Sequence, residues 1–365
     1  MDNTFMLRAV ELARKGIGLT SPNPVVGSVV VHKGRIVAEG WHKKAGGDHA
    51  EIVAIKKFCK LGVDAAKCEL YVTLEPCCHV GKTGPCTTAI IEAGFKKVFI
   101  GMRDPFSQVN GGGVKALKKA GVEVEFIGKK DGLIRQIAEI NQSFLKWVRT
   151  ALPYVVLKAG MSLDGKIATV AGESKWITSE VARKDGRMER GKYDAVLVGS
   201  GTVRKDDCEL AALDKKKNLL RIIIDKDLSL PTTRKVFRDE NVFVACTDLA
   251  SVENQNRFLK AGVDFKSFGK SRVDIPQLLA YFGKWGVQSI FVEGGAKTHG
   301  AFFDSGNFDK VIFYIAPKII GGEKSPSVIG GAGVTRLSEI SDLGDMECEK
   351  IGKDLKVTAV RHFYS

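Results

Sequence analysis

A histidine, two cysteines and an acidic residue in the first quarter of the chain have the side-chain types of a catalytic zinc centre. His49 stands two residues before Glu51, and Cys77 and Cys86 each follow a proline. One imidazole and two thiolates supply three protein ligands to zinc and leave the fourth tetrahedral position for water. The metal lowers the pKa of that water, so that a hydroxide forms near neutral pH. A carboxylate that is not a ligand must then carry protons, and we predict this role for Glu51.

The spacing of the cysteines leaves an alternative open. Zinc nucleobase deaminases use His-x-Glu followed by Pro-Cys-x-x-Cys, whereas eight residues separate Cys77 from Cys86 here. Cys78 or His79 could also bind the metal, which would give a closed structural site. We assign Cys77 and Cys86 because a proline precedes each one and Cys86 begins an expected helix. The favoured chemistry is hydrolytic removal of an amino group from a heterocyclic ring.

Glycines that follow apolar segments mark a second candidate site in the other half of the chain. They occur in Gly199-Ser200-Gly201 and in Gly294-Gly295. Glycine permits close approach of the backbone to a pyrophosphate. No G-x-G-x-x-G motif opens a βαβ unit, so a Rossmann fingerprint is not indicated. By themselves these segments indicate either a cofactor site or ordinary tight turns.

The elements that must position the zinc ligands alternate between helix and strand. Because strands alternate with helices, we expect a layered α/β sheet. Helices are expected over residues 4–15, 49–59, 86–93 and 114–120, and a further helical stretch over 133–149; strands are expected over 25–31, 34–39, 70–74, 98–102 and 122–127.

A domain boundary is expected near residue 150, because Pro153 precedes a fresh strand. The resulting domains are residues 1–148 and 149–365. The second domain again alternates, which indicates another α/β sheet. Its expected strands are 154–159, 195–198, 219–225, 242–245, 289–293 and 310–316, and its expected helices are 181–189, 254–261, 275–285 and 298–305.

Composition excludes several classes of protein. Of the 365 residues, 44% are hydrophobic and 27% are charged, which is ordinary for a globular protein, and the net charge is +14. No apolar run is long enough for a membrane span, and the first residues lack the pattern of a signal peptide. Eight cysteines are too few for a disulfide scaffold. We therefore expect a cytoplasmic protein with no membrane partner.

The positive charge does not by itself indicate a nucleic acid. A nucleic-acid deaminase should carry basic residues interleaved with aromatic ones near its site. Around residues 75–110 the aromatic residues are only Phe95, Phe99 and Phe106. We expect no nucleic-acid partner, and a basic surface that favours phosphorylated small substrates.

Three segments resemble one known family, the bifunctional deaminase–reductases of riboflavin biosynthesis. They are Asn23 to Gly27, His49 to Glu51 and Thr73 to Cys86. The longer cysteine spacing is this family's own form of the motif. The resemblance implies a zinc-dependent, cytidine-deaminase-like three-layer domain that acts on a diaminopyrimidinone carrying a ribosylamino 5-phosphate. It implies substrate contacts by Asn23, His42, His79, Lys82 and Asp104.

The resemblance continues through the second domain and covers nearly the whole chain. It implies a dihydrofolate-reductase-like fold that uses NADPH to reduce the ribosyl group to a ribityl group. We also expect a homo-oligomer. The implied NADPH contacts are Gly160, Trp176, Thr202, Asp206, Gly294 and Gly295; the implied substrate contacts are Lys158, Ser174, Arg190 and Glu293.

The chain departs from the family pattern at several positions. The family usually reads Asp-Asp-Pro-x-Leu-Thr-x-Arg where this chain reads Asp206 to Leu213 without the Pro, the Thr and the Arg. That arginine is expected to bind the substrate phosphate, and one of the lysines at 215–217 could replace it only as a point charge. Lys226 and Phe106 stand where the family usually has Ser and Asn. The alternative to a bifunctional enzyme is therefore a deaminase with a weakened or inactive reductase domain.

Overall fold

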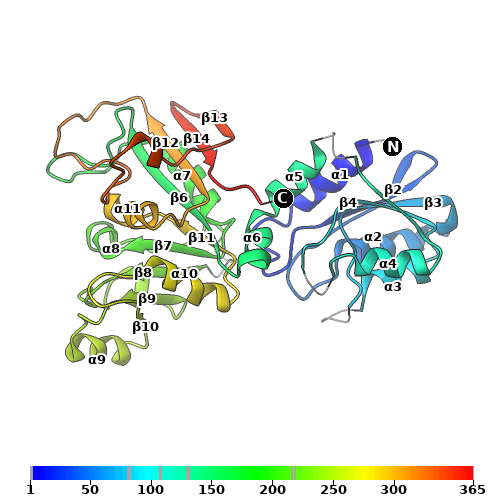
Figure 1. The fold of residues 1–365 in the computed structure, drawn as a ribbon, viewed down its shortest axis with the longest axis horizontal. Helices are drawn as coiled ribbons and strands as arrows, with labels where there is room; N and C mark the ends of the chain where they lie inside the picture. Colours follow the sequence, from blue (N-terminus) through cyan, green and yellow to red (C-terminus); the bar gives the residue numbers. More distant parts are fainter. Residues whose placement is uncertain are drawn as a thin grey trace. The chain divides into compact units, whose positions relative to one another are not determined.

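The computed structural model describes residues 3–79, 84–106, 109–128, 132–214, 217 and 219–364. The chain forms two compact units (Figure 1). One comprises residues 1–150 together with 364–365, and the other comprises residues 151–363.

The first unit is built on a five-stranded mixed sheet in the order β2-β1-β3-β4-β5. Strand β1 runs antiparallel to β2 and β3, whereas β3, β4 and β5 run parallel. The expected hairpin between the first two strands is confirmed, with Lys33 and Gly34 at positive φ in its turn. The strands are β1 (Gly27–His32), β2 (Arg35–Trp41), β3 (Cys68–Leu74), β4 (Lys97–Met102) and β5 (Glu123–Phe126); the helices are α1 (Asn3–Arg14), α2 (Ala50–Phe58), α3 (Cys86–Glu92), α4 (Gly112–Lys119), α5 (Leu133–Ile140) and α6 (Gln142–Thr150).

Helices cover both faces of this sheet, which confirms the expected three layers. Leu70 and Val72 of β3 pack in one apolar core with residues of α2, α3 and α4. Because side chains alternate along a strand, Tyr71 points to the other face, where its ring stacks on Phe99 and contacts Phe5 of α1.

A glycine in β2 allows α2, the helix next to the first predicted site residues, to pack closely against the sheet. A Cβ on Gly40 would lie 2.1 Å from the backbone oxygen of Ala50, the first residue of α2. Only glycine therefore allows this close approach between strand and helix. The contact fixes the start of α2 next to the sheet, and His49 and Glu51 with it.

The helical stretch expected over 133–149 is present, and Asn141 divides it into α5 and α6. The backbone of Asn141 has φ −114°. Its side-chain Oδ1 accepts from Val25 N at 2.8 Å, and its Nδ2 donates to Val25 O at 3.2 Å. The side chain of Gln142, which begins α6, pairs with the main chain of Tyr364: Oε1 accepts from Tyr364 N at 2.9 Å and Nε2 donates to Tyr364 O at 2.6 Å.

The second unit is built on a nine-stranded sheet in the order β10-β9-β8-β7-β11-β6-β12-β14-β13. The strands are parallel as far as β12, and β14 and β13 are antiparallel to their neighbours. The strands are β6 (Tyr154–Ser162), β7 (Ala195–Gly199), β8 (Leu220–Ile224), β9 (Val242–Cys246), β10 (Asp264–Ser267), β11 (Ser289–Val292), β12 (Lys310–Ala316), β13 (Met346–Ile351) and β14 (Asp354–Val360); the helices are α7 (Glu180–Arg190), α8 (Ser200–Asp206), α9 (Val252–Lys260), α10 (Ile275–Lys284) and α11 (Ala296–Asp304).

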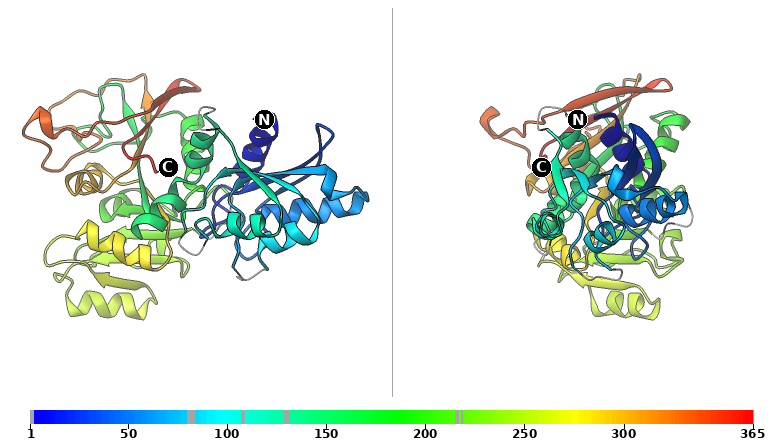
Figure 2. Two further views of the ribbon diagram at one scale, coloured as in Figure 1. Left: turned by 45° about the vertical axis from the view of Figure 1, so that its right-hand side comes forward. Right: turned by 90° about the vertical axis from the view of Figure 1, so that its right-hand side faces the viewer.

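Helices also cover both faces of this second sheet (Figures 1 and 2). Residues of α10 and α11 join one apolar core, and residues of α8 and α9 join another. Four elements are absent from the sequence prediction: α8, β10, β13 and β14. Strand β13 (Met-Glu-Cys-Glu-Lys-Ile) has only two alternating apolar residues before Lys350, and its residues are exposed along almost the whole strand, so its sequence gives a weak strand signal. Helix α8 begins with Ser200 and Gly201, two residues that are typical of turns, so the sequence did not predict a helix there.

Candidate active sites

The first unit brings His49, Cys77 and Cys86 together. His49 is the N-cap of α2, Cys77 follows the end of β3, and Cys86 is the first residue of α3. The Nδ1 atom of His49 lies 3.2 Å from Cys86 Sγ and 3.6 Å from Cys77 Sγ. Within the described part of the chain, these three residues form the cluster of His, Cys, Asp or Glu that could hold a metal ion.

The donor set fits zinc. Hydrogen bonds from the thiol and the backbone N–H of Cys86, together with His49, lower the pKa of Cys77 to about 4, against the effect of burial. A thiolate is therefore ready at neutral pH, and imidazole with thiolates suits Zn²⁺. Cys78 instead points toward the start of α4. Its Sγ lies 2.7 Å from the position that a Cβ on Gly112 would take. This placement supports three ligands and an open fourth position.

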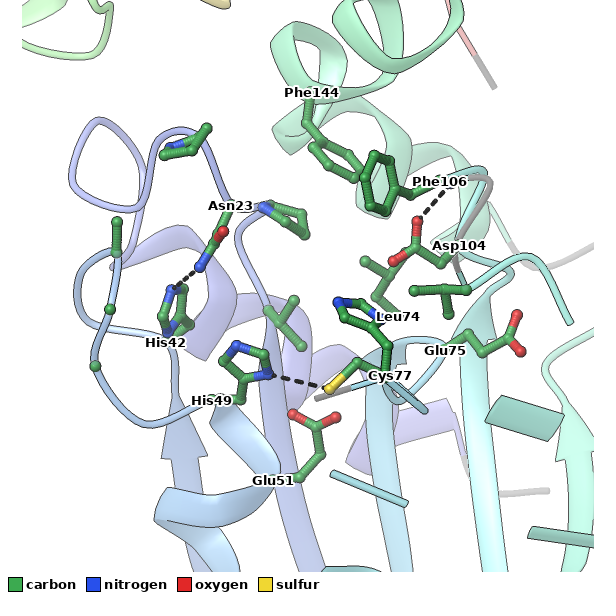
Figure 3. Close-up of a pocket in the computed structure, with 18 of the residues that line it drawn as sticks. Asn23, His42, His49, Glu51, Leu74, Glu75, Cys77, Asp104, Phe106 and Phe144 are labelled. Atoms are coloured by element: carbon green, nitrogen blue, oxygen red, sulfur yellow. Dashed lines mark hydrogen bonds between the residues drawn. The ribbon is translucent and has the colours of Figure 1, made fainter. Parts of the chain in front are cut away.

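Glu51 lies beside the predicted ligands in the first turn of α2. Its side chain is buried, with the residue 3% exposed, and its carboxylate points toward His49 and Cys77 (Figure 3). Burial raises its pKa to about 7. A group with this pKa both accepts and releases protons near neutral pH, as a proton carrier requires.

A cavity of about 350 Å³ opens above these groups. Its size suits a small-molecule ligand. The substituted residue Phe106 forms part of its wall, with Phe144 and Trp147 of α6, which sequence reasoning had not singled out. The predicted Lys82 lies outside the described residues. The predicted residues that line the cavity are Asn23, His42, His49, Glu51, Cys77, His79 and Asp104.

Hydrogen bonds set the direction in which His42 and Asn23 present their polar atoms (Figure 3). The backbone oxygen of Asp48 lies 3.0 Å from His42 Nδ1, so this nitrogen donates. Burial lowers the pKa of His42, which favours the neutral ring. Its Nε2 then accepts from Asn23 Nδ2 at 3.1 Å, and the side-chain oxygen Oδ1 of Asn23 can accept a hydrogen bond from a ligand.

Asp104 and His79 provide two further polar groups in the cavity. Asp104 Oδ1 accepts from the backbone N–H of Phe106 at 2.9 Å. Burial nevertheless raises the pKa of Asp104 to about 6. The Nδ1 atom of His79 is buried and has no hydrogen-bond partner among the described residues. A buried polar atom of this kind needs a partner, and a bound ligand would provide one.

Glu75 is a positioning residue that sequence reasoning missed. It is 3% exposed, and its carboxylate turns away from the predicted ligands in Figure 3. Its Oε2 accepts from Gly111 N at 3.1 Å, and its Oε1 accepts from Val114 N at 3.0 Å. Glu75 thus anchors the start of α4 to the end of β3, two residues before Cys77. No sequence signal identifies the two backbone partners.

In the second unit, the predicted glycines gather at the ends of neighbouring parallel strands. Gly160 is in β6, Gly199 ends β7, and Gly294 follows β11, which pairs with both. A Cβ on Gly294 would lie 2.3 Å from the side chain of Thr298, whereas a Cβ on Gly295 would meet open space. Gly295 is the N-cap of α11, with no side-chain cap. The first N–H groups of α11 can thus receive a phosphate of NADPH.

Three of the predicted substrate contacts form one charged cluster. The carboxylate of Glu293 accepts from Arg190 Nε at 2.7 Å and Nη2 at 2.8 Å, and lies 3.8 Å from Lys158 Nζ. Burial alone would raise the pKa of Glu293, but Lys158 and Arg190 more than offset this and lower it to about 2. The fourth contact, Ser174, lies in the segment between β6 and α7.

The other predicted NADPH contacts lie around the start of α7 and in α8. The guanidinium of Arg183 lies 4.1 Å from the ring centroid of Trp176. Lys175 Nζ lies 2.9 Å from Asp206 Oδ1. Thr202 and Asp206 both belong to α8.

The segment that departs from the family pattern is tied to the end of α7. Arg190 Nη1 donates to the backbone oxygen of Ala211 at 2.7 Å, and Leu213 is 45% exposed. The amine of Lys217 donates to the backbone oxygen of Gly191, and burial lowers its pKa to about 8. Of the three lysines considered as replacements for the arginine, Lys215 and Lys216 lie outside the described residues.

Comparison with known proteins matches both halves of the chain to described families. Residues 1–102 match the cytidine and deoxycytidylate deaminase zinc-binding region. Residues 153–357 match the RibD C-terminal domain. No helix among the described residues is both long and apolar enough to cross a membrane.

Similar proteins match over nearly their whole length. The riboflavin biosynthesis protein RibD of Bacillus amyloliquefaciens is 43% identical over 99% of this chain and 96% of its own. That of Escherichia coli is 37% identical over 97% and 98%. Among solved structures, Acinetobacter baumannii RibD has a TM-score of 0.85 at 33% identity, covering 99% of both chains.

A Thermotoga maritima structure also has a TM-score of 0.85, at 36% identity over 99% of this chain and 98% of its own. It is described as a diaminohydroxyphosphoribosylaminopyrimidine deaminase/5-amino-6-(5-phosphoribosylamino)uracil reductase. The family models, the full-length identities and the matching folds agree with one another. The chain therefore belongs to the family of the riboflavin biosynthesis protein RibD.

Proposed function

We propose that this protein carries out two successive steps of riboflavin biosynthesis. The first is deamination of 2,5-diamino-6-(5-phosphoribosylamino)pyrimidin-4(3H)-one, and the second is NADPH-dependent reduction of the ribosyl group to a ribityl group. We assign the first step to residues 1–148 and the second to residues 149–365. The observation that carries the proposal is the zinc-type donor set of His49, Cys77 and Cys86 beside buried Glu51 in a cavity.

In the first step, Glu51 moves protons while the other cavity residues hold the ring. Zinc, when bound, supplies an activated water molecule for attack on the amino-bearing carbon. Glu51 accepts one proton from the attacking water and gives it to the ring nitrogen as the C–O bond forms. It then carries the remaining hydroxyl proton to the amino group, which leaves as ammonia when the C–N bond breaks. The oxygen of Asn23 accepts a hydrogen bond from the substrate, and His79 and Asp104 provide further polar contacts.

In the second step, the charged cluster of Lys158, Arg190 and Glu293 binds the substrate, and the glycine-rich strand ends bind the cofactor. NADPH supplies the hydride. The backbone around Gly294 and Gly295 receives the cofactor phosphate, and Trp176, Thr202 and Asp206 contact the cofactor. Lys158 lies near the reacting sugar, while Arg190, Glu293 and Ser174 orient the substrate.

Two coupled measurements test the proposal. Zinc-loaded protein is given the diamino substrate, and ammonia release is followed; it is then given the deaminated substrate, and loss of NADPH absorbance is followed. We expect saturable turnover in both assays. Ammonia release without NADPH oxidation would instead mean a deaminase whose second unit has lost its chemistry, as the altered segment from Asp206 to Leu213 would permit. Failure of both assays would overturn the proposal.

We also propose a cytoplasmic, homo-oligomeric enzyme without nucleic-acid or membrane partners. The cluster of metal-binding cysteines at 77 and 86 supports a reducing compartment, where such clusters are typical of metal sites and not of disulfides. Strand β13 lies at one edge of the nine-stranded sheet, which supports self-association, because an edge strand offers backbone groups to a second copy. Light scattering of the purified protein tests the oligomer: a monomeric mass at working concentration would refute it.

A further inference from the structure

Lys158 lies in a narrow gap between helix α7 and the ring of Tyr314. A Cβ on Gly186 of α7 would lie 3.1 Å from Lys158 Cε, 3.2 Å from its Nζ and 3.8 Å from Tyr314 Cε2. The Lys158 Nζ lies 5.6 Å from the centroid of the Tyr314 ring. The side chain thus passes the one position of α7 that has no side chain of its own.

The sheet register brings Tyr314 to this gap. Lys158 of β6 pairs with Ile312 of β12, and Tyr314 pairs with Gly160 two residues further along. Residues two apart on a strand share a face. Lys158 and Tyr314 therefore project from the same face of neighbouring strands, the face that α7 covers at Gly186.

Buried charged groups hold the Tyr314 ring in place. Tyr314 is 1% exposed, and its hydroxyl donates to Asp185 Oδ2 at 2.5 Å. Lys356 Nζ lies 2.9 Å from this carboxylate and 2.9 Å from Glu189 Oε1. The two proposed reaction steps use none of these groups. Burying ions is costly unless they are paired, and their effect here is to fix one orientation of the ring.

We propose that Gly186 and Tyr314 are positioning residues that hold the Lys158 amine beside Glu293 for the reductase reaction. The inference rests on the proposed function of the second unit. A lysine side chain is long and flexible and loses about 2 kcal/mol of rotamer entropy when it is fixed. Confinement by α7 on one side and by the electron-rich ring face on the other restricts the amine to one place before substrate binds.

Gly186→Ala separates positioning from stability. Glycine within a helix costs about 1 kcal/mol relative to alanine, so the variant should unfold at the same temperature or higher. The new Cβ crowds the flexible end of Lys158 and makes only ordinary contact with the Tyr314 ring, so we expect the Lys158 atoms to move. Since misplacement by about 1 Å can cost roughly 100-fold in rate, kcat for NADPH oxidation should fall about 10- to 100-fold, with the KM for NADPH little changed.

Gly344→Ala is the matched control. A Cβ there would meet the backbone oxygen of Val360 at 3.5 Å, which is ordinary contact. We expect it to retain wild-type turnover. If Gly186→Ala retains wild-type turnover as well, the inference is wrong.

Two substitutions of Tyr314 separate the ring from its hydroxyl group. Tyr314→Phe keeps the ring face and loses only the bond to Asp185, whereas Tyr314→Leu removes the ring. We expect the Phe variant to recover most of the kcat that the Leu variant loses. Equal losses in both variants would contradict a role for the ring. Tyr193→Leu, which removes a buried ring stacked on Phe291, controls for general loss of packing.

A spectroscopic measurement keeps the inference testable without turnover. Reductive methylation with ¹³C-formaldehyde labels lysine amines, and comparison with Lys158→Arg identifies the Lys158 resonance. We expect Gly186→Ala and Tyr314→Leu to shift this resonance, because the amine leaves the ring, and Gly344→Ala to leave it unchanged. Absence of NADPH oxidation by the unsubstituted protein would refute the proposed reductase, whereas an unshifted Lys158 resonance in both variants would refute the positioning role.

Discussion

The charge of Glu293 should stabilise the second unit in a way that acid removes. The ordinary pKa of a glutamate is 4.5, and the pKa of Glu293 is lowered to about 2 by Lys158 and Arg190 despite burial. Because each pH unit corresponds to about 1.36 kcal/mol, the difference is worth about 3 kcal/mol of unfolding free energy. A lowered pKa stabilises the folded state above about pH 4.5, and this stability is lost as pH falls toward about 2. Roughly 2 kcal/mol of it should be gone by about pH 3.

Glu293→Gln should remove this contribution. At about pH 7 the variant loses at least the 3 kcal/mol or so worked out above, because it also leaves Arg190 buried without its partner. The difference from the unsubstituted protein should narrow as pH falls to about 3. Urea unfolding of the second unit across this range measures the difference at each pH.

Glu349→Gln provides the control. The Glu349 side chain is 60% exposed and lies 3.3 Å from Lys356, so its loss should change the unfolding free energy by less than about 1 kcal/mol at every pH. A gap between Glu293→Gln and the unsubstituted protein that stays constant from about pH 7 to about pH 3 would refute the reasoning. It would mean that the Glu293 carboxylate is not held ionised by its two cationic neighbours.

Three further substitutions test other parts of the structure. Glu51→Gln should keep zinc but slow ammonia release by about 100- to 10,000-fold, because the amide cannot carry a proton; metal analysis with retained turnover would disprove the role. Glu75→Gln should destabilise the first unit by about 1–3 kcal/mol, because one buried N–H at the start of α4 loses its acceptor; Glu69→Gln, in the strand β3 that precedes Glu75, is the control, and equal urea midpoints would argue against the anchor. Leu213→Arg should lower the KM for the deaminated substrate by about 10- to 100-fold, because it restores a planar cation for the phosphate; an unchanged KM would count against that reading of the position.

The sequence predicts most of the first unit because its elements have strong patterns. Alternating apolar residues and hairpin chemistry locate β1 and β2, and the proline–cysteine pairs mark where β3 ends and α3 begins. The division of the long helix at Asn141 was not predictable, because its cause is a hydrogen bond to Val25, more than a hundred residues away in sequence. Periodicity reports only local structure.

The candidate sites divide in the same way. The types and spacing of His49, Glu51, Cys77 and Cys86 are enough to predict three zinc ligands and a proton carrier. Residues that act on other residues give no such signal: Glu75 binds backbone N–H groups near the start of a later helix, and Tyr314 lies beside Lys158 on a neighbouring strand. Their importance depends on which strands lie next to each other, and that order is set by the whole fold.

The pairing of Gln142 with Tyr364 has a consequence for how the chain can be cut and rearranged. Because residues 364–365 belong to the first compact unit, the second unit is an insertion within the first and not an appendage to it. Two hydrogen bonds close a loop spanning 222 residues. A truncated protein that stops at residue 150 lacks the C-terminal residues that belong to the first unit. A tag fused directly after residue 363 would put foreign residues in their place. A circular permutant that links the C-terminal segment to α1 and opens the chain inside the second unit would keep the first unit covalently whole.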